Sequence, residues 1–246
     1  MGEVCAATRL RGLGDELRKQ RPDRFEASGE RQGKGVRAIL KSLGRALVLS
    51  AGVASVISLA AAPALAASTW TVKPGGAVTA KAGATTVNDT TANLAVTCKS
   101  STIKGTLKSG SGLAGKALGS LSSLAFGSCT ADGVSLSVTI KAKMSLNGVS
   151  FNKTKNTASM TITGIHGKLS ISNPISCSAV INGTSATANN GKVTATFTNK
   201  TNTLKVLTTG SNLHLYNDTC PVTASGDAVN FTSSYKFTPA QKITSP

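Results

Sequence analysis

Two histidines, His166 and His214, are the only side chains that offer a general base of the usual kind near neutral pH. His214 lies between two leucines, and the alternation of apolar and polar residues places those leucines on an inward face and His214 on a solvated one. His166 precedes Gly167, which predicts a turn. We therefore expect ordinary structural roles for both histidines.

Carboxylate chemistry has an equally poor basis. After residue 66 the acids are four isolated aspartates, Asp89, Asp132, Asp218 and Asp227, which lie in or beside apparent turns. Glycosidases need a pair of carboxylates, and calcium needs several oxygens close together. An enzyme of unrecognised type would have to work through one histidine or a lone aspartate.

Nucleophile and phosphate motifs are also missing after residue 66. No Gly-x-Ser-x-Gly motif marks a hydrolase serine. Residues 110–117 resemble a phosphate-binding loop, but Ala117 stands where a hydroxyl would hold magnesium, so we interpret the segment as a flexible Gly/Ser connection. The sequence predicts no catalytic, cofactor-binding or metal-binding residue, and a protein that is not an enzyme.

An export signal occupies residues 36–66. Basic residues at positions 37, 41 and 45 precede an apolar run over 46–62, and Ala64-Leu65-Ala66 is a small-residue cleavage site. A permanent membrane-spanning helix is the alternative for this run. We expect cleavage between Ala66 and Ala67, export by the general secretory route, and no stable membrane anchor after cleavage.

Residues 1–35 form a polar leader of a kind that export signals seldom carry. An overlong gene model would explain it, with Val36 as a GTG-encoded start. N-terminal sequencing of the precursor tests this hypothesis. The secreted domain is then predicted to span residues 67–246.

Four of the five cysteines lie in this predicted secreted domain: Cys98, Cys129, Cys177 and Cys220. An even number of cysteines after an export signal predicts disulfides. No two have the close spacing typical of zinc sites. Three connectivities are open, and we favour the sequential pairs Cys98–Cys129 and Cys177–Cys220, because each half of the domain would then hold one bond.

The predicted secreted domain is strongly basic. Residues 1–66 hold 11 of the 27 basic and 6 of the 10 acidic residues, which leaves 16 lysines, 4 aspartates and a formal charge of +12. This charge favours anionic neighbours such as cell-wall polymers or acidic glycans. Arginine is absent, so bidentate recognition of phosphate or guanine is not expected, and binding should be salt-sensitive without nucleic-acid specificity. The alternative is that the lysines only keep a Ser/Thr-rich surface soluble.

Period-two alternation dominates this domain. In Val134–Ile140 the valines, Leu136 and Ile140 share one face while Ser and Thr share the other. The same pattern predicts further strands over 70–72, 94–98, 121–126, 143–146, 159–165, 168–171, 175–181, 193–197, 204–207, 213–216 and 229–237. Turn signals separate them at 74–76, 131–133, 147–148, 182–183, 189–191 and 210, and residues 109–120 are predicted to be a long loop. The expected fold is all-β, an antiparallel β-sandwich or a partly open barrel.

A diverged internal duplication is a further hypothesis, with pseudo-repeats over about 67–150 and 151–246. Cys98 and Cys177 both have inward parity on their strands, and each leads into a Gly-Thr pair. Among the few aromatic residues, Trp70, Tyr216 and Tyr235 are the candidates for stacking on sugars, and we expect Trp70 to be a core anchor of the first strand instead.

Four phrases carry a resemblance: Trp70-Thr-Val-Lys-Pro-Gly-Gly76, Leu107-Lys-Ser-Gly-Ser-Gly-Leu113, Ile162-Thr-Gly-Ile-His166 and Leu204-Lys-Val-Leu-Thr-Thr-Gly-Ser-Asn-Leu-His214. They resemble a family of uncharacterised secreted β-rich proteins from Streptomyces and related actinomycetes, over Trp70–Pro246. The resemblance implies export and an approximate layout, and no activity or ligand. The small two-disulfide β-sandwich chromophore carriers of actinomycetes are similar more loosely, since they are shorter and generally acidic.

The function predicted from the sequence is that of a secreted, non-catalytic β protein that binds anionic cell-envelope or matrix polymers weakly. The alternatives are an extracellular enzyme of unrecognised type and a β-lined pore or small-molecule carrier. The sequence predicts no cofactor and does not indicate an oligomeric state.

Overall fold

The computed structural model describes residues 69–141 and 143–246, so the polar leader, the export signal and the cleavage site at Ala66 and Ala67 lie outside the described residues. Every regular element in the described part is a β-strand, and none of it forms a helix long and apolar enough to span a membrane. The strands are β1 Thr69–Lys73, β2 Gly76–Ala82, β3 Thr85–Asp89, β4 Leu94–Leu107, β5 Gly110–Ala114, β6 Gly119–Ala131, β7 Val134–Lys141, β8 Met144–Asn152, β9 Thr157–Ile171, β10 Cys177–Asn182, β11 Gly191–Thr198, β12 Thr203–Val206, β13 Leu213–Tyr216, β14 Ala228–Thr238 and β15 Lys242–Thr244.

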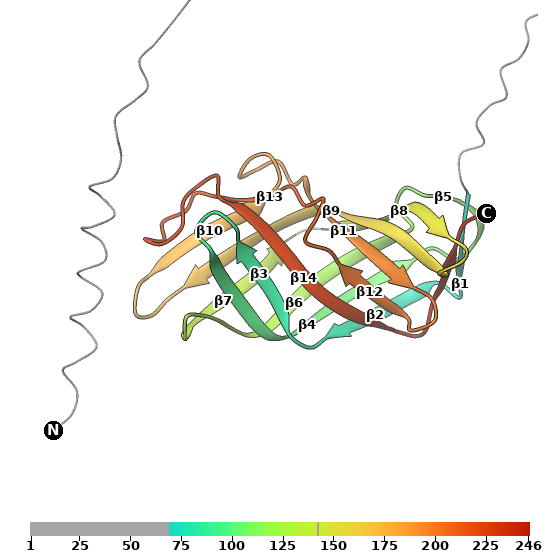
Figure 1. Cartoon of the computed structure of the whole chain (residues 1–246), viewed down its shortest axis with the longest axis horizontal. Coiled ribbons are helices and arrows are strands. Elements are labelled where there is room, and N and C mark those ends of the chain that lie inside the picture. The colour runs from blue at the N-terminus through green and yellow to red at the C-terminus, as the bar shows by residue number, and fades with distance from the viewer. Residues whose placement is uncertain (1–68, 142) are drawn as a thin grey trace, which may run out of the picture. The chain divides into compact units, whose positions relative to one another are not determined.

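One antiparallel sheet of twelve strands forms the body of the molecule (Figure 1). Four strands, β4, β6, β9 and β14, are long, and the others lie in line as the pairs β2/β3, β7/β8, β10/β11 and β12/β13. Because β14 pairs with β2 and β3 as well as with β12 and β13, the sheet closes on itself. The all-β prediction is confirmed, and the pairings arrange the strands as a closed barrel.

The interior of the barrel is apolar, as the alternation predicts. On β11 the residues Val193, Ala195 and Phe197 are buried, while the intervening threonines are half-buried on the outer face. On β14 Phe231 and Phe237 point inward in the same way. Inward and outward positions alternate because successive side chains of a strand point to opposite faces of the sheet.

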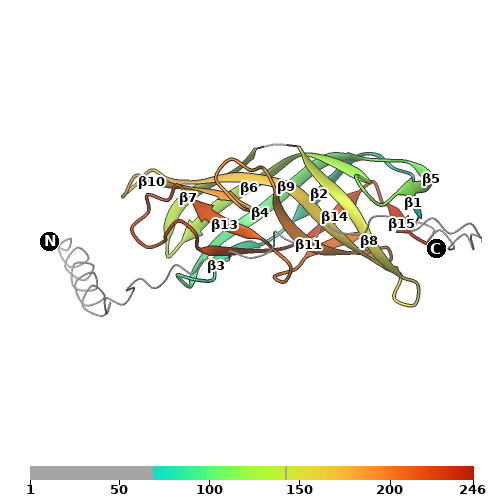
Figure 2. The same ribbon diagram turned by 90° about the horizontal axis from the view of Figure 1, so that it is seen from above.

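Successive turns alternate between the two ends of the barrel (Figures 1 and 2). We call one end the loop end; it holds the turns 90–93, 132–133, 172–176 and the segment 217–227. We call the other the capped end; it holds the turns 108–118, 153–156 and 199–202 together with a three-stranded sheet of β15, β1 and β5. Each long strand therefore reaches both ends.

Trp70 of β1 fills the interior of the capped end. Its side chain is only 1% exposed. A Cβ on Gly148 would lie 2.4 Å from the indole ring, and a Cβ on Gly115 would lie 2.8 Å from the indole Nε1. The prediction of Trp70 as a core anchor is confirmed, because β1 inserts this ring between two glycine backbones.

Two predictions for this region are wrong. Residues 147–148 are not a turn: β8 continues through them to Asn152, because Gly148 leaves room for the Trp70 ring. Residues 109–120 are not a single long loop, since β5 pairs with β1 in the three-stranded sheet. By contrast, Asp132 and Gly133 form the predicted turn, both with positive φ (47° and 82°), as a two-residue hairpin turn requires.

The cysteines pair in the sequential order. Cys98–Cys129 joins directly opposite residues of β4 and β6, and Cys177–Cys220 joins the start of β10 to the segment 217–227. Strands of both halves of the chain pair where β8 meets β9 and where β14 meets β2 and β3, so one barrel contains both. The internal duplication stays a prediction.

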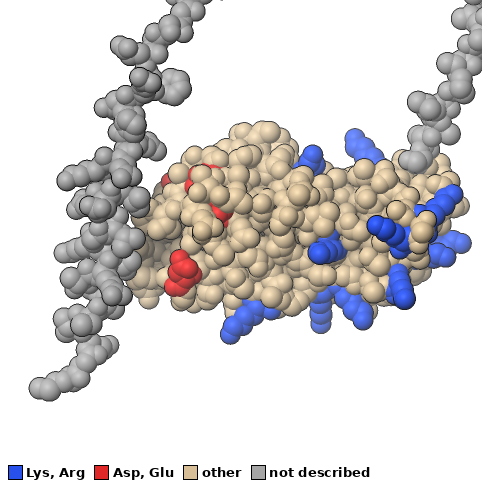
Figure 3. Space-filling model, in the orientation of Figure 1, with Lys and Arg blue, Asp and Glu red and all other residues tan. Residues whose placement is uncertain are grey.

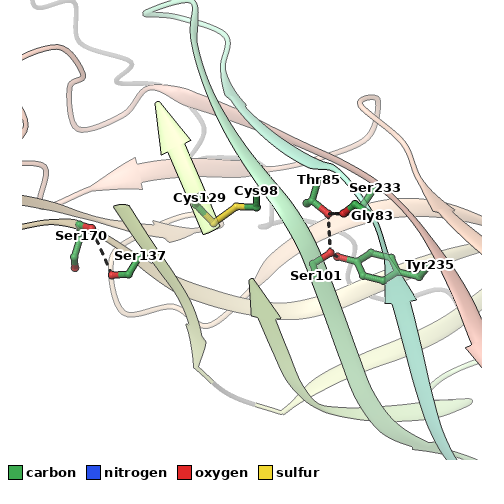
Figure 4. The surroundings of a disulfide bond; sticks show 9 residues. All are labelled: Gly83, Thr85, Cys98, Ser101, Cys129, Ser137, Ser170, Ser233 and Tyr235. Carbon is green, nitrogen blue, oxygen red and sulfur yellow. Dashed lines mark hydrogen bonds between the residues drawn. A yellow bond between two sulfur atoms is a disulfide. The ribbon is translucent and has the colours of Figure 1, made fainter. Parts of the chain in front are cut away.

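Four hydroxyl groups form a buried cluster halfway along β4 (Figure 4). The Thr85 hydroxyl lies 2.6 Å from that of Ser101 and 2.8 Å from that of Ser233, and Ser101 donates to the Tyr235 hydroxyl oxygen at 2.9 Å. Burial raises the pKa of Tyr235, partly offset by its hydroxyl neighbours. The cluster satisfies polar groups that a barrel interior would otherwise leave unpaired.

Candidate functional site

Charge is segregated between the two ends of the barrel (Figure 3). All four described aspartates belong to the loop end: Asp89 ends β3, Asp132 lies in the turn 132–133, and Asp218 and Asp227 lie in 217–227. The turns of the loop end contain no lysine, whereas those of the capped end contain lysines and no acid. Every lysine whose side chain the structure describes is exposed.

Four lysines form a row across four adjacent strands, which we call the lysine row: Lys104 of β4, Lys81 of β2, Lys236 of β14 and Lys205 of β12. Lys81 and Lys236 are directly opposite each other. Lys104 pairs with Thr79 and is thus diagonal to Lys81, and Lys205, which pairs with Ser234, is diagonal to Lys236. Opposite side chains start about 5 Å apart and diagonal ones about 7–8 Å apart.

A second pair of lysines is directly opposite at the capped end, Lys73 of β1 and Lys242 of β15. Like charges that face each other across two strands destabilise a sheet. The four described aspartates lie at the loop end, away from both lysine pairs. Two such lysine pairs, Lys81 with Lys236 and Lys73 with Lys242, argue that these lysines serve a role other than stability.

An open hollow of about 320 Å³ lies at the capped end. Lys73, Lys200 and Lys242 line it together with the amide residues Asn156, Asn199, Asn202 and Gln241. Three ammonium groups around one hollow attract an anion. The neighbouring side-chain amides hold the walls of the hollow in place.

Side-chain amides fasten the hollow together. Asn199 accepts from the Ile243 backbone N–H at 2.7 Å and donates to the Ile243 carbonyl at 2.9 Å. Asn202 accepts from the Gln241 backbone N–H, and Gln241 accepts from the Gly75 N–H at 3.0 Å. These bonds tie β15 and the start of β2 to the β11–β12 turn. The backbone that carries the three lysines of the hollow is therefore held in place.

Both histidines lie beside the loop 183–190, and the sequence does not indicate this placement. The Asn182 amide donates to the His166 Nδ1 at 3.2 Å, and the His214 Nδ1–H donates to the Asn212 carbonyl at 3.0 Å. None of the hydrogen bonds that the described residues form joins either ring to a carboxylate. A general base with an orienting acid is therefore not assembled here.

The predicted turn at His166 is wrong, because His166 lies inside β9. A Cβ on the following Gly167 would come within 2.6 Å of Ile140 Cδ1, so the glycine permits close packing and does not end the strand. The prediction for His214 is confirmed, since its two leucine neighbours are buried and it is half-buried on the other face.

The aromatic candidates for sugar stacking do not present free faces. Trp70 and Tyr235 are fully buried. Tyr216 is half-buried, and its hydroxyl donates to the Gly183 carbonyl at 2.8 Å. Charge and hydroxyl groups, rather than aromatic rings, are thus what the outer surface of the barrel offers to a polymer.

No family model, curated protein or solved structure matches the chain. The site must therefore be understood from its own residues. The lysine row was not predictable from the sequence, because its members are separated by up to 155 positions and the strand register alone aligns them. The excess of lysine was the one signal for it.

Proposed function

We propose that this protein is a secreted, non-catalytic β protein that binds anionic cell-envelope or matrix polymers through the lysine row and the lysine-lined hollow of the capped end. The observation that carries the proposal is the direct opposition of Lys81 and Lys236 within a row of four lysines. A sheet surface under selection for stability alone would place opposite or neutral side chains there.

The chemistry suits a flexible polyanion. Hydroxyl residues share this outer face, since the strand partners of the four lysines are Thr79, Thr102, Thr203 and Ser234. An ammonium group is a hydrated point charge and lacks the planar two-pronged donor geometry of a guanidinium group. It can therefore bind phosphate or carboxylate groups from many directions. The resulting binding is broad and weakens as salt screens the charges.

Export fits the same function. The two disulfides are typical of proteins that mature in an oxidising compartment, where acidic polymers of the envelope are the abundant anions. This supports the export signal that the sequence predicts over residues 36–66.

The test compares two triple variants with the same change in net charge. Lys81, Lys205 and Lys236→Gln alters the row, and Lys143, Lys168 and Lys192→Gln alters lysines elsewhere on the barrel. Binding to teichoic acid and to polygalacturonate is measured by calorimetry in low salt. We expect the row variant to bind at least about tenfold more weakly than wild type, and the matched variant to stay within about threefold of it.

Equal losses in the two variants would show that only net charge matters and would overturn the assignment to the row. Absence of binding to either polymer at any ionic strength would remove the proposal altogether. Raising the salt concentration to about 0.3 M should weaken wild-type binding and narrow the gap between the variants.

A further inference from the structure

Two small apolar chambers lie in the interior of the barrel, an outer one at the loop end and an inner one nearer the middle of the barrel. The inner chamber has a volume of about 30 Å³ and is lined only by apolar side chains. The outer chamber has a volume of about 50 Å³. Val87, Ile181 and Val229 line both, so the chambers lie back to back within one apolar region. A cavity of about 10–15 Å³ on this measure holds one water-sized group, so the two chambers together have room for about six such groups.

One carboxylate lies in the wall of the outer chamber. Asp89 is 6% exposed, and its Oδ1 accepts from the backbone N–H groups of Thr91 at 2.9 Å and Ala92 at 2.8 Å. Its Oδ2 is buried and accepts no hydrogen bond from any described group. A buried carboxylate oxygen without a donor is costly, which makes it a ready acceptor for a ligand.

The segment 217–227 covers the outer chamber. Val222 and Thr223 contribute to the lining, and Cys220 fastens the segment to β10 through its bond with Cys177. Val222 is nevertheless 63% exposed, and Ile175, just before the same disulfide, is 53% exposed. The predicted strand from Ile175 in fact begins at Cys177. Two of the large exposed apolar residues thus lie close in sequence to the disulfide that fastens this segment.

We propose that the loop end binds a small primary alkylammonium compound, with the alkyl tail in the two chambers and the ammonium group on Asp89 Oδ2. An apolar cavity with one polar group in its wall is the usual form of a small-molecule site. The ammonium group supplies the hydrogen bond and the opposite charge that Asp89 lacks. Asp132, Asp218 and Asp227 add negative potential at this end, while the lysine row and the lysine-lined hollow lie toward the other.

The test uses three ligands of one chain length: hexylammonium, hexan-1-ol and hexanoate. Calorimetry on the purified protein should give the tightest binding for hexylammonium, at least about tenfold weaker binding for the alcohol, and the weakest for hexanoate, which Asp89 repels. Lengthening the ammonium from butyl to hexyl should tighten binding about fourfold per methylene and then level off when the chambers are full.

Asp89→Asn retains an oxygen that can accept from Thr91 and Ala92, so the fold should persist, as circular dichroism would check. It should lower hexylammonium affinity to the level of the alcohol. Asp132→Asn, an exposed charge at the same end, is the matched control and should leave binding unchanged. Ala131→Leu, which places a larger side chain in the outer chamber, should remove binding of both compounds.

The proposal would be overturned by any of three results: no saturable binding, tighter binding of hexanoate than of hexylammonium, or equal hexylammonium affinity in wild type and Asp89→Asn. Failure of polyanion binding at the capped end would leave these results unaffected, because the two sites lie on different residues.

Discussion

The capped end and the loop end of this barrel are built from the same long strands and differ in what fills them. At the capped end large side chains such as Trp70, Phe197 and Leu204 are fully buried. At the loop end the outer chamber is lined in part by smaller or half-exposed side chains, among them Ala131, Ala179 and Thr223. A barrel encloses a volume that its inward side chains must occupy, so smaller side chains leave a cavity.

The capped end is filled because β1 comes from outside the ring of paired strands. It brings the Trp70 ring into the interior, and Gly148 and Gly115 make room for it. No described strand from outside the ring covers the loop end, where the segment 217–227 and one disulfide lie instead. Charge follows the same division, with lysines around the capped end and aspartates around the loop end.

Trp70→Ala tests the packed end and should have the largest effect. Loss of a fully buried indole should lower the free energy of unfolding by about 3–5 kcal/mol. Val222→Ala at the loop end should change it by less than about 0.5 kcal/mol, because Val222 is mostly exposed. Denaturant unfolding of both variants measures the difference, and similar losses would contradict the contrast between the ends.

Tyr235→Phe tests the hydroxyl cluster halfway between the ends. It removes the acceptor of the Ser101 hydroxyl and should lower the free energy of unfolding by about 1 kcal/mol near neutral pH. Because burial raises the pKa of Tyr235 above 10.0, the unfolded chain loses this proton first as pH rises, and wild-type stability should fall above pH 10.

Unfolding curves between pH 9 and 11 measure this dependence. In Tyr235→Phe the decline should be shallower than in the wild type. An unchanged slope in Tyr235→Phe would show that other groups cause the decline.

Lys236→Glu should have a smaller effect on stability than Tyr235→Phe, and of the opposite sign. It places a carboxylate directly opposite Lys81, so the free energy of unfolding should rise by about 0.5 kcal/mol in low salt while polyanion binding weakens. Lys192→Glu is the control, because Lys192 pairs with Thr163. A variant that gains stability and loses binding would sharpen the view that the lysine row serves binding, whereas a loss of stability would contradict it.

Much of the fold could be predicted because strand alternation is local. Val134, Leu136 and Ile140 share a face whatever the rest of the chain does, and the Asp132-Gly133 turn suits positive φ at both positions. Strands β2 and β3 were missed, since Gly76, Ala80 and Ala82 give weak apolar contrast and only pairing with β4 shows that they form one line.

The candidate sites were harder to predict from the sequence than the strands. A count of lysines indicates an anionic partner, but not which lysines act together. Asp89 is one of four aspartates near turns, and only its burial beside the outer chamber distinguishes it from Asp132.

The sequence by itself determined the all-β class, the basic charge and the absence of familiar catalytic motifs after residue 66, because each depends on residue type and near spacing, and it favoured the sequential pairing of the cysteines that the structure shows. The tertiary structure decided the rest. Asn147-Gly148 has the same turn chemistry as Asp132-Gly133, yet it lies inside β8, because the Trp70 ring needs the space beside Gly148. Contacts between distant segments also align the lysine row and leave the chambers, since register and packing depend on partners that a local pattern does not contain.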